Sequence, residues 1–155
     1  ADGMHLFFNM FTLYSFGGAV QGLFMAKLGS MGFVLFYLAA LAVAIIPTYL
    51  KQKNNPRYSS LGASGAVSAV VFSYVLMNPW STLLVFFIPV PAIIFAALYV
   101  GYSVWADGQG RGGINHSAHL VGAIFGMLAT ILVEPAIVPH FFNALMHPRF
   151  LGMGG

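Results

Sequence analysis

The chain has 155 residues, of which 59% are hydrophobic and only 6% charged, and its mean hydropathy is +0.87. A soluble domain carries about 25% charged residues, so this chain has too few charges to cover a water-soluble fold. The composition therefore excludes an ordinary soluble protein and indicates an integral membrane protein. The formal charge of +3 rests on very few residues and points to no nucleic-acid partner, and the absence of cysteine excludes disulfide and thiolate chemistry.

Uncharged runs between the few charged residues predict five membrane-spanning helices, because one span needs roughly 20 apolar residues. The run between Arg57 and Asp107 is long enough for two helices, and Asn78-Pro79 is the natural turn between them. In chain order, the predicted spans are residues 5–26, 31–50, 61–77, 81–104 and 115–133. Since these segments do not alternate polar and apolar residues, strands are not expected. The predicted fold class is all-α, a polytopic transmembrane helix bundle.

Residues 135–155 differ from the rest of the chain in composition. They mix Phe141 and Phe142 with His140 and Arg149, whereas the preceding spans are almost uniformly apolar. We therefore predict a membrane core over residues 1–134 and a C-terminal tail, 135–155, that lies on the membrane surface.

Polar groups inside lipid are costly and rare, so each one in a span is a candidate for function. The only acids are Asp2, Asp107 and Glu134, and all lie at span ends or in loops. An aspartyl protease needs two intramembrane carboxylates, and a His-Glu-x-x-His zinc protease needs a glutamate beside its ligands. An ion-coupled transporter usually keeps a buried acid. Because the predicted spans contain no such acids, hydroxyl and imidazole groups are the remaining candidates for chemistry.

Ser64 lies in Gly62-Ala63-Ser64-Gly65, immediately after a polar loop and at the start of the third span. Backbone N–H groups at a helix start lack intrahelical partners and can face an oxyanion. The flanking glycines would let a substrate backbone approach. The alternative is helix packing, which an isolated motif of small residues more often serves. The soluble-hydrolase elbow is excluded, because it requires glycine where Ala66 stands.

His119 begins a pattern on the fifth span, with Gly122 and Gly126 following on the same helical face. Such a glycine face lets another helix come close. If that neighbour carries Ser64, the imidazole can take the hydroxyl proton during nucleophilic attack. The alternative is a structural histidine that forms a hydrogen bond between helices.

His5 and Asn9 are four residues apart and share one face of the first span. Both side chains can donate hydrogen bonds, as stabilisation of a developing oxyanion requires. The alternative is that both side chains form structural hydrogen bonds between helices.

Together the three patterns resemble the rhomboid family of intramembrane serine proteases. His-x-x-x-Asn opens the first span, Gly-x-Ser-Gly the third, and His-x-x-Gly-x-x-x-Gly the fifth. The resemblance extends from about residue 4 to 134. It implies a six-helix core in which this chain supplies helices two to six, so that a first helix is expected to be missing.

The resemblance also implies a Ser-His dyad of Ser64 and His119 that works without a third acid. The implied oxyanion site combines the Ser64 backbone N–H with His5 and Asn9. The reaction would be hydrolysis of peptide bonds in or near transmembrane segments of other proteins in the bilayer, with no metal or organic cofactor. The oligomeric state stays open.

Two positions depart from the family pattern. Many rhomboids place a tyrosine four residues after the nucleophile, where it stacks on the catalytic histidine, and here that position is Ser68. An orienting aromatic is therefore expected from elsewhere. The family also often has a glutamate near the end of the first of these spans, and the closest candidate in this chain is Gln21. Neither departure touches the dyad.

By resemblance, the active site opens to the extracytoplasmic side of a bacterial cell membrane. In this orientation, four basic residues would be external and two cytoplasmic. The positive-inside rule favours the opposite orientation, because it places most basic residues in the cytoplasm. The external set is Lys51, Lys53, Arg57 and Arg111, and the cytoplasmic set is Lys27 and Arg149.

Two other functions compete with a protease. One is an inactive rhomboid-like protein that binds membrane clients without cutting them. The other is a small transporter or scaffold, in which Pro89 and Pro91 would break a helix along a pathway.

Overall fold

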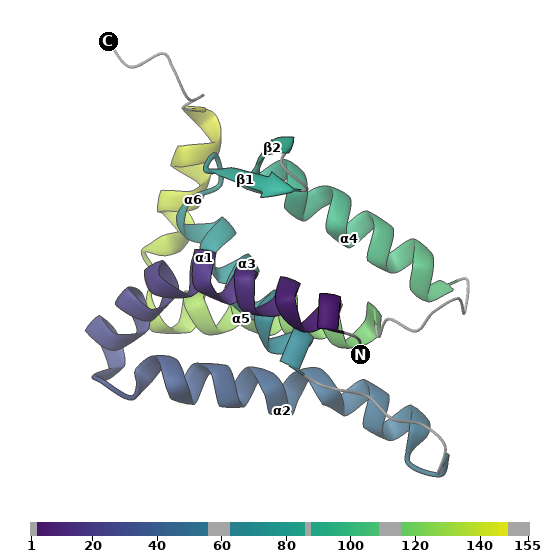
Figure 1. The fold of residues 1–155 in the computed structure, drawn as a ribbon. Helices are drawn as coiled ribbons and strands as arrows, with labels where there is room; N and C mark the ends of the chain where they lie inside the picture. The colour runs from purple at the N-terminus through teal and green to yellow at the C-terminus, as the bar shows by residue number, and fades with distance from the viewer. Residues whose placement is uncertain (1–2, 56–62, 86–87, 109–115, 149–155) are drawn as a thin grey trace.

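The computed structural model describes residues 3–55, 63–85, 88–108 and 116–148, and Figure 1 shows them as a helix bundle with one small hairpin. The elements in chain order are α1 (Gly3–Leu28), α2 (Gly32–Gln52), α3 (Ala63–Met77), β1 (Thr82–Val85), β2 (Ile88–Pro91), α4 (Ala92–Gly108), α5 (His116–Val133) and α6 (Ile137–Met146). The first, second, third and fifth predicted spans each correspond to one of these helices. The mostly helical fold is confirmed.

The fourth predicted span, 81–104, is wrong at its start, and so is the expectation of no strands. Residues Thr82–Val85 and Ile88–Pro91 form an antiparallel hairpin, in which Thr82 pairs with Pro91 and Val85 with Ile88. The helix begins only at Ala92. The physical reason is proline: Pro89 and Pro91 lack a backbone N–H and would break the interior of a helix, while a two-stranded edge tolerates them.

By helix length and hydropathy, the described residues support fewer membrane spans than the five predicted. Among the described residues, only Gly32–Gln52 is long and apolar enough to cross a membrane alone. Ser117–Val133 and Ile137–Met146 form a second candidate only if they count as one span bent by 112°. Ala63–Met77 and Ala92–Trp105 are apolar but shorter. The number of five spans is therefore not confirmed.

The bundle is organised around α3, which lies with α5 between α2 on one side and α4 on the other (Figure 1). Eleven of the 15 residues of α3 are buried. Two apolar clusters meet on this helix, one shared with α1 and α2 and the other with α4, α5 and β1. Their buried members are Val20, Phe24, Phe36, Ala40, Ala66, Ala69 and Val70 in the first, and Val71, Phe72, Val75, Leu83, Ala92, Ala96 and Ala123 in the second.

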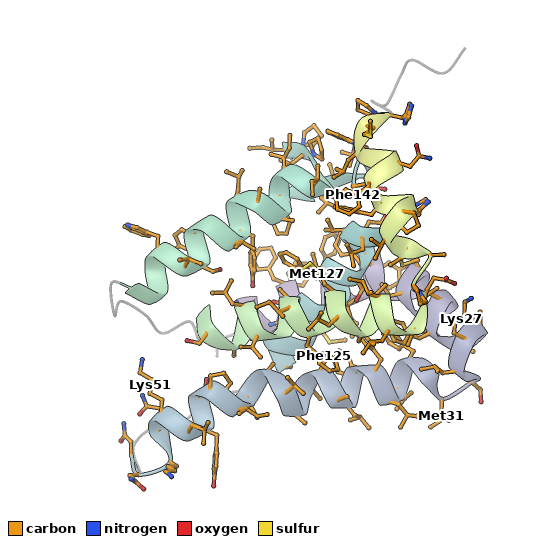
Figure 2. The ribbon with its side chains drawn as sticks, turned by 180° about the vertical axis from the view of Figure 1, so that it is seen from behind. Lys27, Met31, Lys51, Phe125, Met127 and Phe142 are labelled. Atoms are coloured by element: carbon orange, nitrogen blue, oxygen red, sulfur yellow. The ribbon has the colours of Figure 1, made fainter. Side chains whose placement is uncertain are left out.

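Helix α5 contributes to both clusters from its two sides. Figure 2 shows Phe125 directed toward α2 and Met127 on the other side of the helix. Phe125 stacks on Phe36 of α2 with ring centroids 6.0 Å apart, and Met127 packs on the cluster that includes α4. The two central helices are thus held from both sides, which fixes the positions of the residues that they carry.

Charged residues lie at the ends of the bundle. Lys27 and Lys51 lie at opposite ends (Figure 2). Lys27 Nζ forms an ion pair with Glu134 Oε2 at 2.5 Å, which joins the end of α1 to the end of α5. The hydrogen bond from Lys27 holds the pKa of the Glu134 carboxyl below its ordinary value. The structure thus places this acid at the end of α5, away from His119 near its start. The 1–134 and 135–155 division stays a prediction, although α6 gives the C-terminal segment a helix of its own.

Candidate active site

The glycines of α5 bring it against α3. A side chain at Gly122 would collide with the Gly65 carbonyl oxygen, and one at Gly126 would collide with that of Ala69. Gly65 is equally confined, since a Cβ there would lie 2.5 Å from the Ala44 Cβ of α2. Because the contact positions advance by four residues on both helices, α3 and α5 run parallel. Their N-terminal ends therefore lie together.

Ser64 is the second residue of α3 and His119 the fourth residue of α5, so the parallel packing brings both side chains to one end of the bundle. The His119 Nε2 and Ser64 Oγ atoms are 2.7 Å apart, the distance of a strong hydrogen bond. Both residues are half-buried. In the tautomer that carries its proton on Nδ1, the Ser64 hydroxyl donates to Nε2. That is the arrangement from which a base can take the hydroxyl proton.

A cavity of about 210 Å³ lies beside this pair. Asn9 of α1 lines it together with Ser64 and His119, so three of the predicted site residues face one space. Its remaining walls are Phe8, Thr12, Val67, Ser68, Val71, Phe72, Phe95 and Tyr99. A larger cavity of about 930 Å³ lies near α6 and contains none of the predicted site residues. We assign the candidate active site to the smaller cavity, because the reactive groups converge there.

Two predicted site positions lie outside what the structure describes. These are the side chain of His5 and the whole of Gly62. The structure therefore brings together Ser64, His119 and Asn9.

Tyr99 of α4 is a site residue that the sequence did not identify. Its ring stacks on the His119 imidazole, with centroids 6.2 Å apart and planes 20° from parallel. Its hydroxyl lies 2.9 Å from the Ser68 Oγ atom. The signal that could have found it was Ser68 itself, because a hydroxyl on a buried helix face requires a polar partner. The partner lies 31 residues away, and no sequence period connects the two positions.

The site has the parts of a nucleophilic centre. It holds a serine hydroxyl, an imidazole in contact with it, and the start of a helix at which backbone N–H groups lack intrahelical partners. The described residues contain no group of three His, Cys, Asp or Glu side chains that could hold a metal ion. The contact between the hydroxyl and the imidazole is the arrangement that general-base activation of Ser64 requires.

The fold and site define a helical membrane protein with a serine and a histidine in contact. The rhomboid domain profile matches residues 1–136. The chain belongs to the rhomboid family.

Named relatives agree with this assignment. The chain is 34% identical over 137 residues to the Arabidopsis thaliana RHOMBOID-like protein 12, mitochondrial, an alignment that covers 81% of this chain and 41% of the relative. It is 31% identical over 136 residues to the Mus musculus Presenilin-associated rhomboid-like protein, mitochondrial, covering 79% and 33%. It is 28% identical over 138 residues to the Saccharomyces cerevisiae Rhomboid protein 1, mitochondrial, covering 86% and 39%. The chain thus spans less than half the length of each. No solved structure matches the chain significantly.

Proposed function

We propose that the chain carries the catalytic centre of an intramembrane serine endopeptidase, with Ser64 as nucleophile and His119 as general base. The observation that carries this proposal is the 2.7 Å contact between His119 Nε2 and Ser64 Oγ at the edge of a cavity. A protein that only binds clients has no need of this pair in contact. Membership of the rhomboid family supports the same reaction class.

In the proposed reaction, Ser64 Oγ attacks the carbonyl carbon of the scissile peptide while its proton passes to His119 Nε2. The carbonyl oxygen becomes an oxyanion, which the Ser64 backbone N–H and the Asn9 amide would stabilise, with His5 as the third donor that the family resemblance implies. His119 then returns the proton to the leaving amine. Water hydrolyses the acyl-enzyme, again with His119 as the base. The substrates would be transmembrane segments of other proteins.

Labelling with a fluorophosphonate probe tests the proposal against its main alternative, an inactive rhomboid-like protein that binds membrane clients. The probe reacts with activated serines, so the purified protein should gain one adduct, which peptide mass spectrometry should map to Ser64. Incubation with a panel of single-span substrates should give discrete cleavage products. A protein that neither labels nor cleaves any member of the panel would belong to the binding alternative.

Asn9→Ala tests the oxyanion role. Asn9 lines the cavity with the dyad, and loss of one oxyanion donor lowers kcat by roughly 10²–10³. We expect a fall of that size in kcat for substrate cleavage, with KM nearly unchanged. Thr12→Val is the matched control, because Thr12 lines the same cavity and the change keeps its shape. An effect of Asn9→Ala confined to KM would assign the amide to substrate binding instead.

The membrane and the orientation belong to the proposal as well. The named relatives are mitochondrial proteins, which gives the predicted bacterial cell membrane no support. We retain the orientation in which the active-site end opens to the extracytoplasmic side. Asn54 follows α2, and Lys51 near the C-terminal end of that helix lies at this end of the bundle (Figure 2). A cysteine placed there should react with an impermeant reagent added outside, and reaction only from the cytoplasmic side would reverse the orientation.

A further inference from the structure

Tyr99 contacts His119 directly and connects to Ser64 through Ser68, although it lies on a third helix. Its ring faces the His119 imidazole at 6.2 Å and 20°. Such nearly parallel stacking limits rotation of the imidazole about its side-chain bonds. Since Nε2 must point at Ser64 for proton transfer, the orientation of the ring decides whether the base can work.

The Tyr99 hydroxyl reaches the nucleophile through Ser68. Ser68 Oγ donates to the Ser64 carbonyl oxygen at 3.1 Å, and the Tyr99 hydroxyl lies 2.9 Å from the same Oγ. One hydroxyl carries one hydrogen, so with Ser68 donating to Ser64, Tyr99 must donate to Ser68. The result is a chain from the phenol, through Ser68, to the backbone of the nucleophile.

The ring of Tyr99 is itself held in place. It packs against Phe72 of α3 with centroids 5.6 Å apart and against Phe95 of α4 at 5.8 Å. A side chain with three ring contacts and one hydrogen bond keeps a single orientation. It can therefore impose that orientation on His119.

From these contacts we infer that Tyr99 is the positioning residue of the dyad. It supplies from α4 the aromatic ring that Ser68 does not provide. Its ring sets the plane of the His119 imidazole, and its hydroxyl ties α4 to the backbone at Ser64. The inference rests on the proposed function for its catalytic meaning, while the contacts themselves are independent of it. It makes the geometry of Ser64 and His119 depend on α4, which carries neither residue.

Two substitutions separate the ring from the hydroxyl. Tyr99→Leu removes both, and because a misplacement of about 1 Å can lower a rate 10²-fold, kcat should fall by about that factor with KM nearly constant. Tyr99→Phe keeps the ring and removes one hydrogen bond, so kcat should fall only about two- to tenfold. Tyr102→Leu is the matched control on the same helix, where Tyr102 is 56% exposed, and it should leave kcat unchanged.

An exchange variant adds a rescue. Ser68 is 7% exposed, so a tyrosine fits there only after the Tyr99 ring has been removed. The double variant Ser68→Tyr/Tyr99→Ser should therefore be more active than Tyr99→Ser alone, because it returns an aromatic ring to His119 from α3. A merely structural role for Tyr99 predicts no such recovery.

Histidine NMR signals of the detergent-purified protein give a readout that needs no activity. The ring current of Tyr99 should shift the His119 ring protons, and Tyr99→Leu should remove this shift while Tyr99→Phe keeps it. Wild-type cleavage that Tyr99→Leu leaves intact overturns the inference while the proposed function stands. Wild-type protein that shows the ring-current shift but neither labels nor cleaves overturns the proposed function, and with it the catalytic role of Tyr99. Loss of kcat together with loss of the shift supports the inference.

Discussion

Ser64→Ala is expected to abolish substrate cleavage while the protein keeps its fold. Removal of the nucleophile of a serine protease lowers kcat by about 10⁶, which is below detection for most membrane substrates. The structural change is small, because one hydrogen bond to His119 is lost at a half-buried position. His119→Ala should have the same effect on cleavage. The double variant should be no worse than either single one, since the two side chains act as a unit.

Ser73→Ala is the matched control for this prediction. Ser73 lies on the same helix and is fully buried, and its one hydroxyl hydrogen is shared between the carbonyl oxygens of Ala69 and Gly126, which lie 2.8 and 3.0 Å from Oγ. Its loss should cost about 1 kcal/mol of stability and lower the thermal unfolding midpoint, but cleavage should persist. Ser64→Ala should show the reverse pattern. Retained cleavage in Ser64→Ala would rule out Ser64 as the nucleophile.

Gly122→Ala is expected to damage both stability and activity, although it adds a single methyl group. The new Cβ would collide with the backbone carbonyl oxygen of Gly65, which cannot rotate away as a flexible side chain could. Helices α3 and α5 would have to separate, and overpacking of this kind costs about 1–3 kcal/mol. Because Ser64 precedes Gly65 and His119 lies one turn before Gly122, the dyad would open as well. The rate of fluorophosphonate labelling should fall by about 10².

Gly101→Ala provides the comparison for Gly122→Ala. Gly101 lies in the interior of α4, and a Cβ there would meet nothing within 4 Å. Alanine is the better helix former by about 1 kcal/mol, so this variant should be as stable as the wild type or more so, and fully active. Unfolding midpoints and labelling rates of the two variants give the test. Equal values for both would show that the close approach of α3 and α5 does not position the dyad.

The sequence predicted the helices that carry the site because two strong signals coincide there. Sparse charges mark where apolar runs end, and His119, Gly122 and Gly126 mark a helix face that needs a close neighbour. The prediction that α3 is that neighbour came from the family resemblance. The contacts of Gly122 and Gly126 with α3 now supply the physical basis.

Two features of the structure, the hairpin and the position of Tyr99, could not be predicted from hydropathy and motifs alone. Hydropathy placed residues 81–104 in one span, but Pro89 and Pro91 convert its first part to a hairpin. Tyr99 escaped notice because its partners, Ser68 and His119, are distant in sequence and meet it only after α4 has packed. The family resemblance indicated only that an aromatic ring should reach His119 from elsewhere, because Ser68 stands at the usual tyrosine position.

The shortness of α3 bears on how water reaches the reaction. At 1.5 Å per residue, its 15 residues span about 22 Å, whereas the 21 residues of α2 span about 31 Å. The hydrocarbon layer is about 30 Å thick, so the described part of α3 is shorter than the layer. Ser64, the second residue of α3, lines the cavity of about 210 Å³. Hydrolysis consumes water, and under the proposed function this cavity is the space through which water would reach the acyl-enzyme.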